Sequence, residues 1–168
     1  VAGRLLEVID DDILPLTERG VANGNKVFGA AILRKSDLSL VIAGTNDETA
    51  NPLLHGEVHT LNMFYALPQR PDTRELIFLC THEPCSLCMS AITWAGFDNF
   101  YYLFSHADSR DAFAIPHDLR ILHEVFGLEP GGGLAPRHGL VRAGVIGGDA
   151  VGVDGRFGTG GALGIDVF

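Results

Sequence analysis

The chain has 168 residues, 46% of them hydrophobic and 20% charged, which suits a soluble globular domain with its own core. Its formal net charge is −9, and its 12 lysines and arginines are scattered along the chain. Because proteins that bind nucleic acid normally present a basic patch, this balance argues against a nucleic-acid partner and favours a small-molecule substrate. No apolar run approaches the roughly 20 residues that span a bilayer, so no membrane partner is expected.

Apolar periodicity indicates helices and strands in alternation. It predicts a helix over residues 4–21, either kinked or divided in two at Pro15. Two β-rich runs, 27–34 and 38–43, are separated by a short polar segment and predict a hairpin. A polar loop then leads to a predicted helix over residues 54–67.

The second half of the chain continues the alternation. It predicts a buried strand at 76–80, a helix from Pro84 to Ala95, a strand at 100–104, a polar loop and a helix at 118–126. This order predicts a mixed sheet between layers of helices. Residues 131–168 hold 13 of the 21 glycines without a collagen period or an amphipathic pattern, which predicts a tail of flexible or irregular structure.

The three cysteines, Cys80, Cys85 and Cys88, are an odd number in a chain without a recognisable signal peptide. They argue against a disulfide framework and for a reducing, cytoplasmic compartment. In that compartment a C-x-x-C pair is more often metal-binding or redox-active than structural. Cys80 lies within a predicted strand, where it is expected to be a small buried hydrophobe.

The strongest signal combines His55-Gly56-Glu57 with Pro84-Cys85-Ser86-Leu87-Cys88. One imidazole and two thiolates suit Zn²⁺, which favours tetrahedral nitrogen and sulfur sites. Cys85 and Cys88 are three apart in the predicted first helical turn, so they share a face at its positive end, which favours thiolates. Three protein ligands leave the fourth position open for water, the arrangement of catalytic zinc, which lowers the pKa of that water to about 7.

Glu57 lies two residues beyond His55, where its carboxylate can reach such a water without binding the metal. It can take the water's proton, deliver it to a ring nitrogen and later protonate departing ammonia. An H-x-E motif followed by P-C-x-x-C is the signature of zinc-dependent base deaminases. A closed structural site that adds His59 to His55 and the two cysteines, or a redox dithiol, would leave Glu57 unexplained.

At these residues the chain resembles the cytidine deaminase superfamily, in the branch of guanine deaminases, small cytosine deaminases and tRNA adenosine deaminases. The resemblance extends from about Val27 to Phe126 and includes Thr81-His82-Glu83-Pro84-Cys85, similar to the family's T-x-E-P-C, and Ala91-Ile92-Thr93-Trp94-Ala95, similar to A-I-x-W-A of guanine deaminases. It implies a three-layer α/β/α sandwich around a mixed sheet of about five strands. The catalytic domain would then comprise residues 1–130, followed by the tail, in a homodimer.

The resemblance also assigns a substrate pocket. It implies that Phe28 forms part of the entry to the pocket, that Asn46 binds the substrate, that backbone N–H groups near Gly56 hold its carbonyl, and that Trp94 lines the base pocket. Phe28, Asn46 and Trp94 also have structural interpretations, as a strand aromatic, a turn residue and a core residue. The loop from Asn46 to His55 is shorter than in the guanine and tRNA enzymes. His106 and Asp108, beyond the last matched strand, are expected to be solvated loop residues.

These observations predict zinc-dependent hydrolytic deamination of a free nucleobase or small nucleoside, with guanine slightly ahead of cytosine because of Trp94. Zn²⁺ would be bound by His55, Cys85 and Cys88, and Glu57 would carry protons. Two alternatives stay open. A tRNA adenosine deaminase is disfavoured by the acidic balance. A non-catalytic deaminase-fold interaction module with structural zinc is disfavoured by the intact Glu57.

Overall fold

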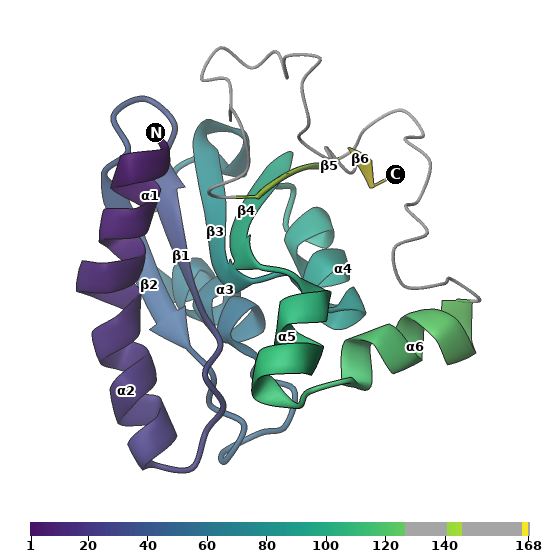
Figure 1. Cartoon of the computed structure of the whole chain (residues 1–168). Helices are drawn as coiled ribbons and strands as arrows, with labels where there is room; N and C mark the ends of the chain where they lie inside the picture. Colours follow the sequence, from purple (N-terminus) through teal and green to yellow (C-terminus); the bar gives the residue numbers. More distant parts are fainter. Residues whose placement is uncertain (127–140, 146–165, 168) are drawn as a thin grey trace.

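The computed structural model describes residues 1–126, 141–145 and 166–167 (Figure 1). The elements in chain order are α1 (Ala2–Val8), the π-helical segment η1 (Ile9–Ile13), α2 (Leu14–Ala22), β1 (Gly29–Arg34), β2 (Leu40–Thr45), α3 (Gly56–Ala66), the 3₁₀ helix η2 (Thr73–Glu75), β3 (Leu76–His82), α4 (Ser86–Trp94), β4 (Asn99–Phe104), α5 (His106–Phe113), α6 (His117–Phe126), β5 (Val141–Val145) and β6 (Asp166–Val167). None of the described helices is long and apolar enough to cross a membrane.

One mixed sheet has the strand order β2-β1-β3-β4-β5-β6. The pairs β1–β2, β1–β3 and β5–β6 are antiparallel, whereas β3–β4 and β4–β5 are parallel. The mixed sheet predicted from the sequence is confirmed, although the strand number differs from five. Residues 29–104 contribute four strands, and β5 and β6 come from the glycine-rich segment. The rest of the predicted tail lies outside the described residues, so the division at residue 130 stays a prediction.

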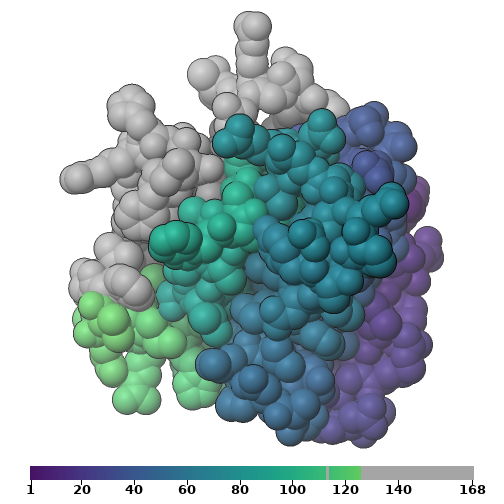
Figure 2. Space-filling view, turned by 180° about the vertical axis from the view of Figure 1, so that it is seen from behind, coloured from purple at the N-terminus to yellow at the C-terminus, as the bar shows by residue number. Residues whose placement is uncertain are grey.

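Helices cover both faces of the sheet, which confirms the three-layer sandwich. On one face, Ala31, Leu33, Ile77 and Leu79 pack against α1 and η1; on the other, alternate residues of the same strands pack against α3 and α4. Viewed from behind, α3 and α4 form much of the centre of the molecular surface (Figure 2). Because β3 is covered on both faces, all of its residues are buried. A strand buried on both sides is a firm base for the loop that follows it.

The N-terminal helical segment is continuous, with a π-helical stretch where the sequence predicted a kink or a break. The π-helical residues Ile9–Ile13 immediately precede Leu14 and Pro15, the first two residues of α2. Proline has no N–H, and in an ordinary α-helix its ring would clash with the carbonyl four residues earlier, here that of Asp11. A wider turn at this point accommodates the ring without ending the helix.

Two predicted boundaries are wrong. The helix predicted from Pro84 begins at Ser86, because Cys85 has an extended backbone and is the N-cap. The polar loop predicted after residue 104 contains α5, which begins with a capping box in which Ser105 and Asp108 satisfy each other's backbone N–H groups. A serine followed three residues later by an acidic residue is a signal for a helix start that the sequence contained.

His82, the last residue of β3, is buried among aromatic rings. Its ring centroid lies 4.7 Å from that of Phe28 and 5.0 Å from that of Phe104. Burial lowers the pKa of His82 to about 4. An unfolded histidine titrates at about 6.5, so between pH 6.5 and 4 the unfolded chain binds more protons than the folded chain. His82 therefore makes the protein less stable as the pH falls through this window.

Replacing His82 by Phe should remove this pH dependence while keeping the aromatic packing. Between pH 7 and pH 5, the free energy of unfolding of the wild type should fall by about 2 kcal/mol more than that of His82→Phe. Denaturant unfolding at both pH values measures the difference, and the variant keeps the same metal ligands. Equal pH dependence in wild type and His82→Phe would contradict this assignment.

Candidate metal centre and active site

The predicted metal ligands lie at the beginnings of two helices in the same layer. His55 is the N-cap of α3, at the end of the loop that follows β2, and has an extended backbone. Cys85 is the N-cap of α4, three residues after β3, and its sulfur accepts a hydrogen bond from the backbone N–H of Cys88. The structure therefore brings His55 together with the two cysteines, which lie 30 and 33 positions later in the sequence.

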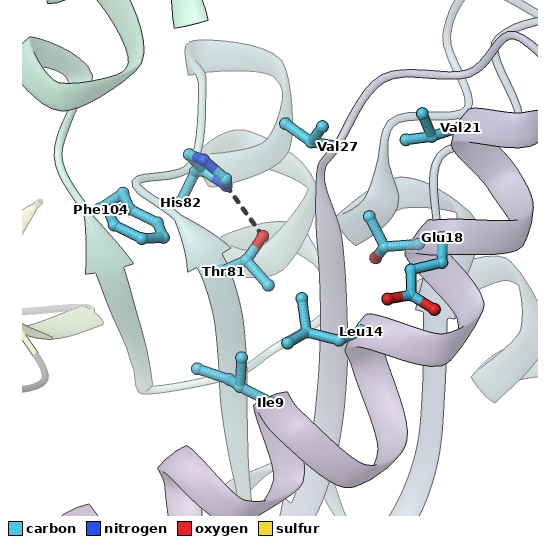
Figure 3. Close-up of a pocket in the computed structure, with 9 residues that line it drawn as sticks. Ile9, Leu14, Glu18, Val21, Val27, Thr81, His82 and Phe104 are labelled. Carbon is cyan, nitrogen blue, oxygen red and sulfur yellow. Dashed lines mark hydrogen bonds between the residues drawn. The ribbon is translucent and has the colours of Figure 1, made fainter. Parts of the chain in front are cut away.

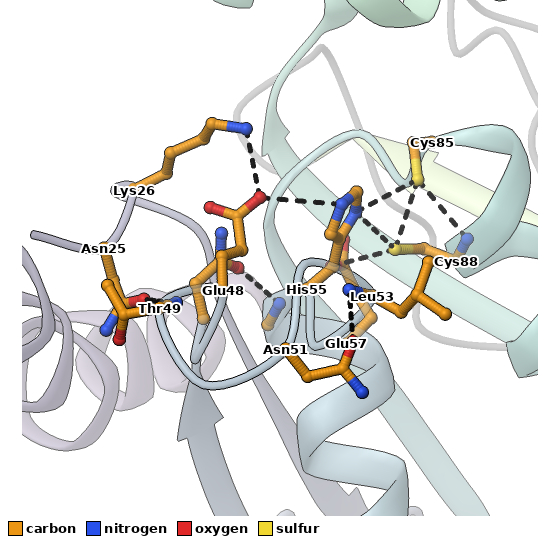
Figure 4. A network of polar contacts seen from close by, with 12 residues as sticks. Asn25, Lys26, Glu48, Thr49, Asn51, Leu53, His55, Glu57, Cys85 and Cys88 are labelled. Carbon is orange, nitrogen blue, oxygen red and sulfur yellow. Dashed lines mark hydrogen bonds and ion pairs between the residues drawn. The ribbon is translucent and has the colours of Figure 1, made fainter.

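Their ligand atoms have the spacing of a zinc site (Figure 4). His55 Nδ1 lies 3.4 Å from Cys85 Sγ and 3.5 Å from Cys88 Sγ, and the two sulfurs are 3.3 Å apart. A tetrahedral zinc ion with ordinary bond lengths separates such atoms by roughly 3.5–3.8 Å, so an opening of less than about 0.5 Å would admit the ion. His59 takes no part, because its Nδ1 lies 2.8 Å from the Thr45 carbonyl oxygen. His55, Cys85 and Cys88 could therefore hold a zinc ion whose fourth coordination position is open.

The two sulfurs share one negative charge. Their mutual contact, and then the contact with His55, lower the pKa of Cys85 to about 4. The same contact between the sulfurs, followed by burial, raises the pKa of Cys88. The Cys85 sulfur raises the pKa of His55 in turn. An anionic sulfur already in place, beside a thiol that a cation would deprotonate, makes a soft, negatively charged site for a divalent metal.

Glu57 lies directly behind this group and is 5% exposed. Its Oε2 accepts a hydrogen bond from the Cys88 thiol at 3.3 Å. Burial, and next the charge of Cys85, raise the pKa of Glu57 to about 7. A carboxylate with a pKa near neutrality can both accept and return a proton, so its environment fits the proton-transfer role predicted from H-x-E.

Gly56 allows α3 to touch the segment that leads into β1. A Cβ atom at this position would lie 2.8 Å from the Phe28 carbonyl oxygen and 3.0 Å from the Gly29 Cα. The Gly56 N–H, which the sequence assigned to the substrate carbonyl, donates to the Asn46 side-chain oxygen. Asn46 is buried, and its Nδ2 atom has no hydrogen-bond partner among the described residues. Asn46 is not among the residues that line the small cavity at the metal ligands, so its role in binding a substrate stays a prediction.

A small cavity contains the metal ligands and Glu57. Its lining comprises Lys26, Phe28, His55, Glu57, Glu83, Cys85, Cys88, Ile115, His117 and Asp118. The structure thus places Phe28 in the cavity wall. Sequence reasoning missed the wall made by Lys26, Glu83 and the segment 115–118. Glu83 belongs to the motif that precedes Cys85, but no spacing indicates that residues beyond α5 return to the metal centre.

Trp94 does not line this cavity. It is the last residue of α4 and is 90% exposed, so the wall of this cavity within one chain does not include it, and its role in binding a base stays a prediction. The helix has the predicted extent at its C-terminal end, but its apolar face is formed by residues such as Cys88 and Ile92, and Trp94 points away from it. The A-I-x-W-A resemblance identified the helix without indicating the direction of the side chain.

His106 also differs from its predicted state as a solvated loop residue. It is 9% exposed, and its backbone N–H donates to Glu83 Oε2 at 2.9 Å. Its ring lies between the carboxylates of Glu83 and Asp118, 3.9 Å from each. Asp108, in contrast, is an exposed capping residue of α5. His106 therefore supports the acidic wall of the cavity from behind.

A larger hollow of about 440 Å³ lies elsewhere, between α2 and the ends of β3 and β4 (Figure 3). Its lining is mostly apolar and includes Leu14, Val21, Val27 and Phe104. None of the metal-binding residues and none of the candidate proton carriers lines it. This hollow is the larger of the two, but the candidate metal ligands and Glu57 line the smaller cavity.

Comparisons with known proteins agree with the site. The family described as the cytidine and deoxycytidylate deaminase zinc-binding region matches residues 12–104. Guanine deaminase of Bacillus subtilis (strain 168) is 29% identical over 87 residues, which are 51% of this chain and 54% of that protein. The chain thus aligns with about half the length of this relative.

Solved structures show the same fold. The crystal structure of guanine deaminase from Bacillus subtilis superposes with a TM-score of 0.59 and 27% identity, covering 71% of this chain and 75% of that one. Guanine deaminase from Nitrosomonas europaea superposes with a TM-score of 0.52 and 20% identity, covering 68% and 63% of the two chains. The protein belongs to the cytidine and deoxycytidylate deaminase family, and its residues His55, Cys85 and Cys88 form a group that could hold the zinc ion.

Purified protein should contain close to one zinc ion per chain. Cys88→Ala should lose the zinc and part of the stability, because metal binding contributes to the free energy of folding. Elemental analysis after gel filtration measures the zinc content. Cys80→Ala is the matched control, since Cys80 is buried within β3 and should leave zinc content unchanged. Full zinc occupancy in a His55→Ala, Cys85→Ala double variant would contradict the ligand assignment.

Proposed function

We propose that the protein is a zinc-dependent hydrolase that deaminates a free nucleobase or small nucleoside, guanine ahead of cytosine, and releases ammonia. The observation that carries this proposal is the position of Glu57. A buried carboxylate with a pKa near 7 lies 3.3 Å from one sulfur of a three-ligand zinc group, in a cavity that the same residues line. A purely structural zinc site has no need for such a group.

Glu57 is the proton carrier in the proposed reaction. When bound, zinc with three protein ligands supplies an activated water as the nucleophile. The C–O bond forms at the ring carbon that carries the exocyclic amine, and the C–N bond to that amine breaks. The Glu57 carboxylate takes one proton from the water and passes it to the adjacent ring nitrogen. It then takes the second proton from the newly added hydroxyl group and delivers it to the departing amine, which leaves as ammonia while the C=O bond forms.

Phe28 and Asn46 are the proposed substrate-orienting residues. The Phe28 side chain offers an apolar wall beside the metal group, suited to a flat ring. The buried Asn46 Nδ2 offers a hydrogen-bond donor, and a buried donor of this kind is stabilised when a substrate acceptor reaches it. Together they favour a flat ring with an acceptor on its edge, which the nucleobases provide.

The reason for favouring guanine as the substrate is now the acidic wall of the cavity and no longer Trp94. Guanine presents its ring N–H and its 2-amino group side by side, and a carboxylate accepts both. Burial, and next the charge of Cys85, raise the pKa of Asp118, so its ionised form needs hydrogen-bond donors. Cytosine lacks this pair of donors. The similarity to guanine deaminase points the same way.

The acidic composition continues to disfavour a tRNA substrate, because a folded RNA partner calls for a basic surface.

We also propose that the protein forms a homodimer and acts in the cytoplasm. The exposed side chains of Tyr65 on α3 and Leu87 and Trp94 on α4 provide apolar surface that a second subunit could cover. Sedimentation velocity at micromolar concentration tests the dimer, and a monomer would contradict it.

Glu57→Gln should separate catalysis from metal binding. The amide has nearly the same size but cannot carry a proton, so kcat should fall by about 10²–10⁴-fold, the usual contribution of a general acid–base group. Zinc content should be unchanged, and KM should change little. Ammonia release by metal-loaded protein measures the rate, with Glu75→Gln at an exposed position as the control. A near wild-type rate would refute the mechanism, and loss of zinc would identify Glu57 as a ligand.

Asp118→Asn tests the choice of substrate. The amide presents a donor where guanine needs an acceptor, so kcat/KM for guanine should fall about 10–100-fold, as for loss of a hydrogen bond to a charged group. Turnover of cytosine should change less than the turnover of guanine. A panel of free bases and nucleosides, read as ammonia release, makes the comparison, with Asp111→Asn on the surface of α5 as the control. Turnover of cytosine or a nucleoside in preference to guanine would overturn the substrate assignment.

A further inference from the structure

An ion pair lies beside the metal group on the side of the loop between β2 and α3 (Figure 4). In this loop, Glu48 Oε1 lies 3.0 Å from Lys26 Nζ and 3.7 Å from His55 Nε2. The other ring nitrogen of His55, Nδ1, faces the two cysteine sulfurs. The imidazole of His55 is thus placed between the metal group and the Glu48 carboxylate, with one ring nitrogen directed to each.

Backbone hydrogen bonds fix the loop that carries Glu48. The Asp47 N–H donates to the Leu54 carbonyl at 2.9 Å, and the Asn51 N–H donates to the Asp47 carbonyl at 3.1 Å. The Thr49 N–H donates to the Asn25 side chain at 3.0 Å, next to Lys26. The Glu48 side chain is only 15% exposed. Its carboxylate is therefore held near His55 by the fold of the loop as well as by Lys26.

We propose that Glu48 is a positioning residue of the metal centre: when zinc binds, its carboxylate, which lies 3.7 Å from His55 Nε2 in this structure, moves within hydrogen-bond distance, accepts the Nε2–H and so keeps Nδ1 free to bind zinc. Histidines that bind metals usually donate their other ring N–H to a carboxylate or carbonyl, which fixes the tautomer and makes the ligating nitrogen more basic. Lys26 holds this carboxylate and offsets its charge beside the two thiolates and Glu57. The inference concerns metal binding and holds whichever substrate the protein uses.

Variants of Glu48 that differ in hydrogen-bonding capacity test the role. Glu48→Leu removes the acceptor, and zinc affinity should fall about 10–100-fold, the usual effect of losing such a partner. Glu48→Gln keeps a neutral acceptor of nearly the same size and should lie between wild type and Glu48→Leu. Competition with a zinc chelator measures affinity without substrate. Asp47→Asn removes one charge from the same loop without touching His55, and it should bind zinc like the wild type.

A spectroscopic readout separates this role from general damage to the loop. In zinc-loaded protein, the NMR resonance of the His55 Nε2–H proton should lie downfield in the wild type and move upfield in Glu48→Gln and further in Glu48→Leu. A zinc affinity of Glu48→Leu within about twofold of Asp47→Asn, or an unchanged His55 resonance, would overturn the proposal. The stability of each metal-free variant is measured in parallel. If Glu48→Leu does not fold, zinc affinity and the His55 resonance are compared between the wild type and Glu48→Gln instead.

The double variant Lys26→Met, Glu48→Leu distinguishes the two partners of Glu48. If the carboxylate acts on His55, the double variant should bind zinc as weakly as Glu48→Leu. If the single variant is weak only because Lys26 is left unpaired near a cation, removing Lys26 as well should restore wild-type affinity, and that result would also overturn the proposal.

Discussion

The contact between the beginning of α3 and the backbone before β1 is the constraint on which the site depends. At Gly56 the two backbones are too close for any side chain. The residues on either side of this glycine lie in different parts of the site: His55 faces the two sulfurs, and Glu57 is buried behind them. Asn46 closes the contact by accepting the Gly56 N–H. A side chain at this one position would move the helix outward and separate the imidazole from the thiolates.

The metal centre could be predicted because its chemistry is contained in residue types and spacings. Few combinations other than zinc catalysis need an imidazole, a carboxylate two residues later and a C-x-x-C pair, so His55, Glu57, Cys85 and Cys88 could be assigned without a fold. The substrate pocket could not be predicted in the same way. Asp118 and His117 reach the cavity only because α5 turns the chain back, and Trp94 is directed by helix packing that a motif does not encode.

In the fold, too, some elements could be predicted from the sequence and others could not. The hairpin, the buried strand β3 and the helices around the ligands follow from apolar periodicity and from proline and glycine positions. The π-helical segment before Pro15 does not, because it is a compromise between a ring that breaks helices and a buried apolar face that continues through Ile9 and Ile13. The helix α5 was missed because its polar sequence has a weak apolar period, although Ser105 and Asp108 mark its beginning. Burial on both faces of β3 also explains why this strand continues to His82, two residues beyond its predicted end.

The placement of all three ligands between residues 55 and 88 has a consequence for the order of events during synthesis. Chains emerge from the ribosome with the N-terminus first, at about 5–20 residues per second. The hairpin, β3 and the ligand set therefore emerge before β4 and before the cavity wall at residues 115–118. A metal ion can be captured by the nascent chain while the site is still open, and the wall that shapes the cavity is added around it afterwards.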